Sequence, residues 1–331
     1  MSNRYRIFGS EMSPYSVKVR SYFRFKGIAH DWIERNRGNE EEFAKHAKLP
    51  LIPLVIAPDG EAMQDSTPII ERLEAQFPEP SIHPPDPAAK FIAEMIEEYA
   101  DEWGNKPMFH YRWFYEPDQK SAAERLARQM TGGDEQAAEG VAEMVKARMV
   151  PRLKFVGSTE ATKDQIERSL YRQLRILEQH LARRTYLFGE RPSLADLGMF
   201  CQLYELSTDP TPGRIIRETA PRVVNWIQEM LGPRPEGSFE SWEALAPTLL
   251  PLLCEEVAGV FFPWSTANAK ALAAGQKEFT VEIDGSPFTQ EVQKYHAKSL
   301  GVLRAKYAAV PDKRRLDPIL EEAGCLEWLG V

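Results

Sequence analysis

Three short motifs near the start of the chain carry groups that could hold an anionic or thiol-containing ligand. The first, Ser13-Pro14-Tyr15-Ser16, lies between a predicted strand and a predicted helix. The first turn of a helix presents unpaired N–H groups and a positive dipole end, so it stabilises a thiolate placed there. A serine hydroxyl can donate a hydrogen bond to sulfur that is losing its proton. Ser13 is equally explained as the N-cap of that helix.

The other two motifs also lie next to predicted strands. Ile52-Pro53 opens a strand, where proline is expected only at a sheet edge or after a cis peptide bond. A cis bond would leave the backbone of Ile52 free to pair with an extended peptide, whereas a trans proline on an edge strand carries no function. Asp65-Ser66 joins a strand to a helix. Ser66 could face an anion there and Asp65 an ammonium group, or the pair could be a plain cap.

The elements that position these motifs follow the order βαβαββα over about the first 78 residues. Alternating and helix-periodic apolar residues, with glycine and proline at the boundaries, define them. Strands are predicted at 4–8, 30–34, 52–56 and 61–64, and helices at 14–25, 39–48 and 66–77.

Five prolines between residues 78 and 87 cannot continue a helix and predict a linker. Beyond it the apolar spacing is helical, which predicts an all-α second region with helices at 88–102, 122–130, 137–149, 163–183, 193–205 and 221–230. A third region is predicted to contain a helix at 239–253, a hairpin turn at Asp284-Gly285 and a helix at 289–307. We therefore predict domains at 1–80 and 88–232, and a C-terminal extension at 233–331 that packs on the helical domain.

The composition narrows the functional class. A net charge of -8 argues against sequence-independent nucleic-acid binding. The three cysteines are far apart, and the histidines lack ligand-type spacing, so we expect neither a disulfide framework nor a metal site. The start lacks the apolar run of a signal peptide, and the apolar stretches 245–254 and 257–264 are short and interrupted by proline. We predict a cytoplasmic protein with no membrane partner.

Together, the three motifs in one βαβαββα frame resemble a cytosolic glutathione transferase over about the first 232 residues. The resemblance implies a thioredoxin-like α/β domain followed by an all-α domain, with glutathione as the bound thiol cofactor and a homodimer as the assembly. Ser13-Pro-Tyr-Ser16 resembles the Cys-Pro-Tyr-Cys of glutaredoxins with both cysteines replaced, and Ser13 matches the serine position of serine-type transferases. Ser13 would then hold the sulfur, with Tyr15 beside it.

By the same resemblance, Ile52 before Pro53 would pair with the cysteinyl backbone, and Asp65 and Ser66 would bind the γ-glutamyl end. Many family members carry Gly-Lys before a Val-Pro pair, whereas this chain has Lys48-Leu-Pro-Leu-Ile52-Pro53, which leaves Lys48 as the candidate substitute. Residues 233–331 are not part of the ordinary pattern. Ser193 and Asp196 resemble the family's buried capping box, which concerns folding rather than catalysis.

The resemblance also implies a second-substrate pocket between the domains. Its candidates are Tyr15, Trp103, Met108, Phe109, His110, Tyr111, Trp113 and Phe114. The same cluster could instead be core, because aromatic residues dominate core burial. An aromatic pocket would favour a bulky apolar or aromatic electrophile.

The predicted function is a glutathione transferase in which a Ser13-stabilised thiolate attacks a small electrophile. The alternative is a non-catalytic glutathione-binding or protein-interaction protein with the same fold. Thiol–disulfide exchange is disfavoured, because it needs a cysteine where this chain has serine.

Overall fold

The computed structural model describes residues 3–330, and it confirms the predicted order of elements in the first region. The elements are β1 (Tyr5–Gly9), α1 (Pro14–Phe25), β2 (His30–Glu34), η1 (Arg37–Asn39), α2 (Glu40–His46), β3 (Leu54–Ile56), β4 (Ala62–Gln64) and α3 (Ser66–Gln76). The strands form one sheet in the order β2-β1-β3-β4. Strand β1 runs parallel to β2 and antiparallel to β3, and Ile7 pairs with Trp32 on one side and Val55 on the other.

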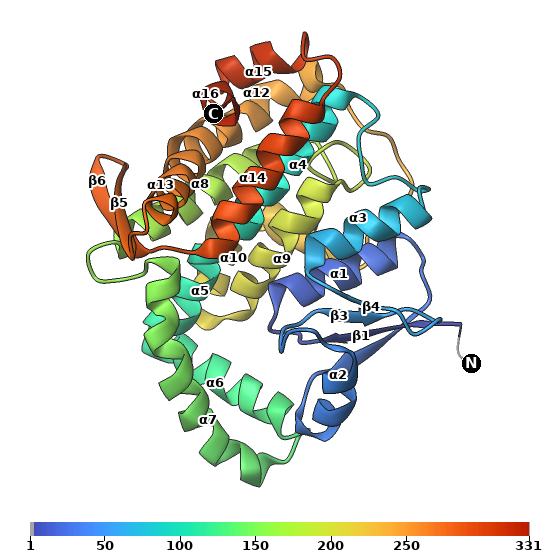
Figure 1. Ribbon diagram of the computed structural model, residues 1–331, viewed down its shortest axis with the longest axis vertical. Helices are drawn as coiled ribbons and strands as arrows, with labels where there is room; N and C mark the ends of the chain where they lie inside the picture. Colours follow the sequence, from blue (N-terminus) through green and yellow to red (C-terminus); the bar gives the residue numbers. More distant parts are fainter. Residues whose placement is uncertain (1–2, 331) are drawn as a thin grey trace.

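Both faces of this sheet are covered. Helices α1 and α3 lie between the sheet and the helical region, and α2 lies on the opposite face (Figure 1). Ile7 and Val55 pack into the main core, whereas Phe8, Leu54 and Ile56 point the other way and pack around Phe43 of α2. Strand β3 begins at Leu54 rather than at residue 52, because Pro53 has no N–H to contribute to a ladder.

The helical region contains two helices that the apolar spacing missed. Its elements are α4 (Pro87–Glu102), α5 (Asn105–Phe114), α6 (Glu116–Met130), α7 (Glu135–Met149), η2 (Val150–Val156), α8 (Lys163–His180), α9 (Leu194–Thr208), α10 (Pro210–Thr219) and α11 (Pro221–Leu231). Helix α5 was missed because it has apolar and aromatic residues on every side and no polar stripe. Helix α10 is short and begins with two prolines in its first three residues.

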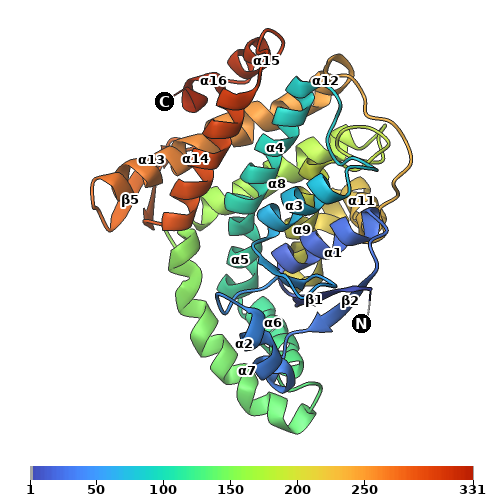
Figure 2. The same cartoon turned by 45° about the vertical axis from the view of Figure 1, so that its right-hand side comes forward.

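Helix α9 is the central helix of this region. It is buried all round and contacts α4, α5, α10 and α11, and α1 of the first region also packs against it. Helices α6 and α7 form a hairpin that projects from the bundle toward α2 in both views (Figures 1 and 2). This hairpin therefore extends the contact between the two regions beyond α1 and α9.

The C-terminal region begins with a continuous helix over residues 242–273, where the sequence predicted a shorter helix at 239–253. It consists of α12 (Trp242–Leu252), the π-helical η3 (Leu253–Phe261) and α13 (Phe262–Ala273). By length and composition this helix could cross a membrane, and half of its most apolar window is buried inside the protein. Packing on α4 and α8 outweighs the cost of two internal prolines, about 3 kcal/mol each.

The rest of the region confirms the predicted hairpin and corrects the helix after it. Strands β5 (Glu278–Ile283) and β6 (Ser286–Glu291) flank the turn at Asp284-Gly285. Thr289 and Gln290, expected in a helix, pair with β5, and the helix α14 (Lys294–Ala309) starts later. The short helices α15 (Leu316–Glu322) and α16 (Leu326–Leu329) follow, and α14 and α15 lie along α4 (Figure 2).

Candidate functional site

A cavity of about 610 Å³ lies between the first region and the helical region. Its walls come from the β1–α1 loop, the start of α1, the loop before β3, and α5, α6, α7 and η2. The lining residues are Ser10, Met12, Ser13, Pro14, Tyr15, Arg35, Ile52, Asn105, Met108, Phe109, Arg112, Trp113, Leu126, Gln129, Met130, Met144, Val145, Arg148, Met149 and Arg152. Six residues singled out from the sequence thus meet at one cavity: Ser13, Tyr15, Ile52, Met108, Phe109 and Trp113.

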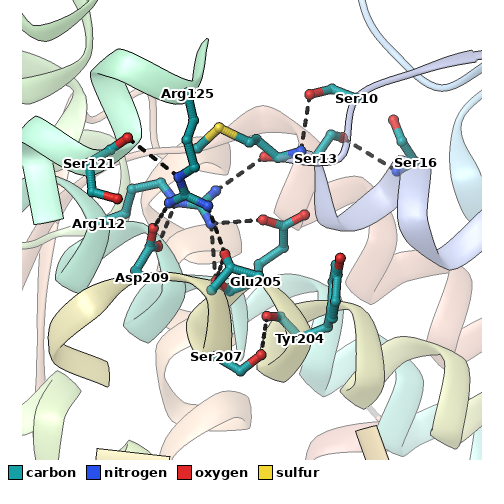
Figure 3. Close-up of polar contacts among 12 residues, drawn as sticks. Ser10, Ser13, Ser16, Arg112, Ser121, Arg125, Tyr204, Glu205, Ser207 and Asp209 are labelled. Atoms are coloured by element: carbon teal, nitrogen blue, oxygen red, sulfur yellow. Dashed lines mark hydrogen bonds and ion pairs between the residues drawn. The ribbon is translucent and has the colours of Figure 1, made fainter. Parts of the chain in front are cut away.

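Ser13 is the N-cap of α1, as the simpler of the two interpretations predicts. Its Oγ accepts a hydrogen bond from the N–H of Ser16 at 3.3 Å, and its own N–H donates to the carbonyl of Ser10 (Figure 3). The cap uses a lone pair of the hydroxyl oxygen and leaves the hydroxyl proton free. Capping and donation to a bound sulfur are therefore compatible roles.

The loop before Ser13 is held by the helical region. Arg112 of α5 donates to the carbonyl of Met12 at 3.1 Å and forms ion pairs at 2.7 Å with Glu205 and Asp209 (Figure 3). Burial opposes the charge of Arg112, but the two carboxylates raise its pKa. Gln129 of α6 also holds this loop, through the hydroxyl of Ser10. In the sequence, Arg112 stands out only as a cation within an aromatic run. A cation that is buried there requires an acidic partner.

Gln129 of α6 bridges the two regions. Its Oε1 accepts from the hydroxyl of Ser10 at 2.6 Å, and its Nε2 donates to the carbonyl of Arg35 at 2.9 Å. The hairpin of α6 and α7 is thereby fixed to the strand ends that flank the cavity.

Tyr15 has its hydroxyl tied to the domain interface. The hydroxyl donates to the carbonyl of Asp101 at 3.0 Å and accepts from Nδ2 of Asn105 at 2.7 Å. Burial and the nearby carboxylate of Asp101 raise the pKa of Tyr15, so the phenol stays neutral. The proton of this hydroxyl is used in the interface. Of the Ser13 and Tyr15 hydroxyls, which both line the cavity, that of Ser13 therefore keeps its proton unused within residues 3–330.

The peptide bond between Ile52 and Pro53 is cis, one of the two alternatives left by the sequence. Ile52 lines the cavity, and within residues 3–330 its N–H and carbonyl have no hydrogen-bond partner. The loop before it is fixed by Gln64, whose amide accepts from the N–H of Lys48 and donates to the carbonyls of Leu49 and Leu51.

Lys48 is exposed and lies in a separate hollow of about 230 Å³, beside β4 and the start of α3. The structure does not place it on the wall shared by Ser13 and Ile52. It lies next to the Asp65 end of β4 instead, since Gln64 lines the same hollow.

Asp65 and Ser66 stand at the N-terminus of α3. Asp65 has a φ of 78°, uncommon for a residue other than glycine, and makes no cap hydrogen bond. Its two carboxylate oxygens instead accept from the hydroxyl of Tyr295, each at 3.0 Å. Tyr295 belongs to α14, and its role has no local signal in the sequence, because the contact joins residues 230 positions apart.

Four of the aromatic pocket candidates lie away from the cavity, because they occupy the other side of the helical region. Trp103 is fully buried and donates to the hydroxyl of Ser169 at 2.8 Å. His110 lies between Ser158 and Glu167. Tyr111 and Phe114 pack around His110. Helix α5 thus presents Met108, Phe109, Arg112 and Trp113 to the cavity and its opposite face to the core.

Comparisons with known proteins match two separate segments of this chain. Residues 7–81 match the family model for the glutathione S-transferase N-terminal domain, and residues 160–229 match that for the glutathione S-transferase C-terminal domain. A probable glutathione S-transferase from Solanum tuberosum is 27% identical over 104 residues, which are 30% of this chain and 46% of that protein. Glutathione S-transferase omega-1 from Mus musculus is 28% identical over 94 residues, 28% of this chain and 39% of that protein. The chain thus spans less than half the length of these curated relatives.

Solved structures of similar proteins cover more of the chain. A glutathione S-transferase from Methylobacterium radiotolerans, solved with glutathione sulfonate, is 22% identical over 74% of this chain and 94% of its own, with a TM-score of 0.44. A beta-etherase from Sphingobium sp. is 21% identical over 68% of this chain and 94% of its own, with a TM-score of 0.49.

The first matched segment covers the sheet region, and the second covers α8, α9, α10 and most of α11. The thioredoxin-like sheet and the helices that follow are the fold that the sequence motifs implied. Residues 7–81 and 160–229 of this chain therefore resemble the N- and C-terminal domains of glutathione S-transferases.

Proposed function

We propose that this protein is a glutathione transferase in which Ser13 stabilises the thiolate of bound glutathione. The observation that carries the proposal is the position of Ser13 at the first turn of α1, on the wall of an interdomain cavity, where its hydroxyl donates to no group within residues 3–330. The helix dipole and the hydroxyl would act together to lower the pKa of a sulfur placed there.

The remaining groups suit a tripeptide with a charged end. Ile52 offers an N–H and a carbonyl, which would pair with the cysteinyl backbone. Asp65 offers a carboxylate for the γ-glutamyl ammonium group, and Ser66 an N–H at a helix N-terminus for the carboxylate. Lys48 lies near that end as a further cation. Glutathione would supply the nucleophilic sulfur, and the chain would supply its ionisation and orientation.

The second substrate in this proposal is a small apolar or aromatic electrophile. Met108, Phe109 and Trp113 of α5 and the methionines of α6 and α7 give the cavity a largely apolar wall. Such a wall favours an aromatic body over a small polar one. We further propose that the protein is cytoplasmic and forms a homodimer. Light scattering of the purified protein would test the dimer.

The test of Ser13 is the variant Ser13→Ala. We expect kcat at pH 7 with glutathione and an activated aryl halide to fall about 10- to 100-fold, as for loss of one hydrogen bond to a charged group. The Kd of glutathione should change little. The kinetic pKa of the thiol should rise toward about 8.5, its value without the protein. The loss of the cap should cost about 1 kcal/mol of folding stability.

The matched control is Ser16→Ala in the same motif, because the buried Ser16 hydroxyl has no hydrogen-bond partner in the described chain. Its pH–rate profile should match that of the wild type. Equal activity of Ser13→Ala and wild type would refute the role of Ser13. Glutathione binding without turnover of any electrophile would favour the non-catalytic alternative.

A further inference from the structure

All the charged side chains that line the interdomain cavity are cationic. They are Arg35, Arg112, Arg148 and Arg152, and within residues 3–330 no aspartate or glutamate joins them. The chain as a whole has a net charge of -8, so the sign of the charge on this wall is opposite to that of the whole protein. A concave surface with one sign of charge concentrates ligands of the other sign.

Two of the four arginines already have acidic partners. Arg112 pairs with Glu205 and Asp209, as described above, and Arg35 donates to Glu40 at 2.6 Å and lies over the ring of Phe43. These two serve the structure of the loops around Ser13. Their charge is largely compensated.

Arg148 and Arg152 are different. In the part of the chain that the structure describes, neither forms an ion pair, and the one side-chain contact of Arg152 is to the sulfur of Met149 at 3.9 Å. They are four residues apart, so they lie on the same face of α7 and η2, together with Met144, Val145 and Met149. Two arginines without ion-pair partners in the described chain therefore line one wall of the cavity, Arg148 exposed and Arg152 half-buried.

The surroundings of these arginines are apolar and adaptable. Met12, Met108, Met130, Met144 and Met149 line the cavity, which is half of the ten methionines in the chain. Methionine fits irregular and varied apolar shapes. The segment from α5 to η2 also lies outside the residues that the two domain models match.

We propose that the electrophile carries an anionic group, a carboxylate or sulfonate, on an aromatic body, and that Arg148 and Arg152 bind this group while the reacting carbon faces Ser13. This inference rests on the proposed function for its chemistry. The planar donor fork of arginine matches a carboxylate or sulfonate, and the methionine wall accepts the ring.

A pair of probes that differ only in charge tests the inference. In 4-chloro-3,5-dinitrobenzoate the glutathione sulfur forms a bond to the ring carbon, the carbon–chlorine bond breaks, chloride leaves and the thiol proton passes to solvent. 4-Chloro-3,5-dinitrobenzamide reacts in the same way but carries no charge. The wild type should favour the benzoate in kcat/KM after correction for the two uncatalysed rates.

The variants are Arg148→Gln, Arg152→Gln and the double substitution. Each single change should lower kcat/KM for the benzoate about 3- to 10-fold, and the double change more than 10-fold. The effects are moderate because partly exposed ion pairs contribute little binding free energy. The benzamide and the KM of glutathione should stay within about twofold. Arg183→Gln, at an exposed arginine outside the cavity lining, is the matched control and should change none of these values.

Two outcomes would overturn the inference. An equal loss for benzoate and benzamide would mean that the arginines only support the structure. A rise in the KM of glutathione, with no preference between the probes, would mean that they bind the carboxylates of glutathione.

A binding measurement keeps this test separate from that of the proposed function. The fluorescence of 1-anilinonaphthalene-8-sulfonate, an anionic aromatic dye, should report binding to the wild type without glutathione and at least tenfold weaker binding to the double variant. The neutral dye N-phenyl-1-naphthylamine should bind both equally. If no electrophile turns over but this difference holds, the proposed function fails and the anion site stands. Equal sulfonate binding in both proteins would refute the site.

Discussion

At the scale of single residues, the contact between Tyr295 and Asp65 connects the C-terminal region to the proposed glutathione site. Burial and the carboxylate of Asp65 raise the pKa of Tyr295, so its hydroxyl remains protonated and donates. A carboxylate has about four lone-pair sites, so Asp65 keeps acceptor capacity for an ammonium group. The two contacts with the Tyr295 hydroxyl, each at 3.0 Å, hold the carboxylate of Asp65 in its orientation.

Tyr295→Phe should therefore weaken glutathione binding about 3- to 10-fold, measured by calorimetry, since it removes one hydrogen-bond donor worth about 1 kcal/mol. A tripeptide analogue without the amino group of the γ-glutamyl residue should bind wild type and variant equally. Tyr307→Phe is the control, because Tyr307 lies on the same helix and donates to Asp317 instead. Tighter binding by Tyr295→Phe would show that Tyr295 competes with the ligand for Asp65.

At the scale of elements, the start of α9 is fixed by a capping box and by two further hydrogen bonds. Ser193 and Asp196 form the predicted capping box. Asp196 also accepts from the N–H of Leu187 at 2.8 Å and from Nε1 of Trp226 at 3.0 Å, and it is fully buried. One carboxylate thus joins the start of α9 to the preceding loop and to α11.

Asp196→Ala should lower the free energy of unfolding by about 3–5 kcal/mol, because three buried N–H groups lose their acceptor. The exposed N-cap Asp134 of α7, which accepts from the N–H of Ala137 at 3.1 Å, gives the comparison. Asp134→Ala should cost only about 1 kcal/mol. Urea denaturation of both variants measures the difference. Similar losses in the two variants would contradict the role assigned to the additional partners of Asp196.

At the scale of the whole molecule, Lys106 marks where three distant segments meet. Its Nζ is fully buried and donates to Oε1 of Gln290 at 2.6 Å and to the carbonyl of Val156 at 3.1 Å. It also lies 4.1 Å from the ring centre of Trp264. Burial lowers the pKa of Lys106 well below its ordinary value.

Folding therefore favours loss of the proton from Lys106, so this residue contributes stability that is present at high pH and is lost as pH falls toward its lowered pKa. The free energy of unfolding of the wild type should rise between about pH 7 and pH 9.5 relative to that of Lys106→Met. Denaturation of both proteins across this range measures the slope. Lys298→Met, at an exposed lysine, should keep the wild-type slope, and a shared slope in all three proteins would contradict the assignment.

The sequence by itself determined the order of elements in the first region, the ends of α1, α3, α4 and α11 to within one residue, and the position of Ser13. These features depend on local causes: apolar spacing, capping side chains, and proline or glycine at boundaries. The capping box of Ser193 and Asp196 was visible for the same reason, since its residues are three apart.

Only the tertiary structure decided which side chains meet at the site. Tyr295 reaches Asp65 across 230 positions, and Arg112 meets Glu205 and Asp209 across 93 and 97. The aromatic run of α5 could not be divided from the sequence into cavity and core residues, because the face it presents depends on the helices around it. The same holds for Arg148 and Arg152, whose lack of partners depends on what other segments place nearby.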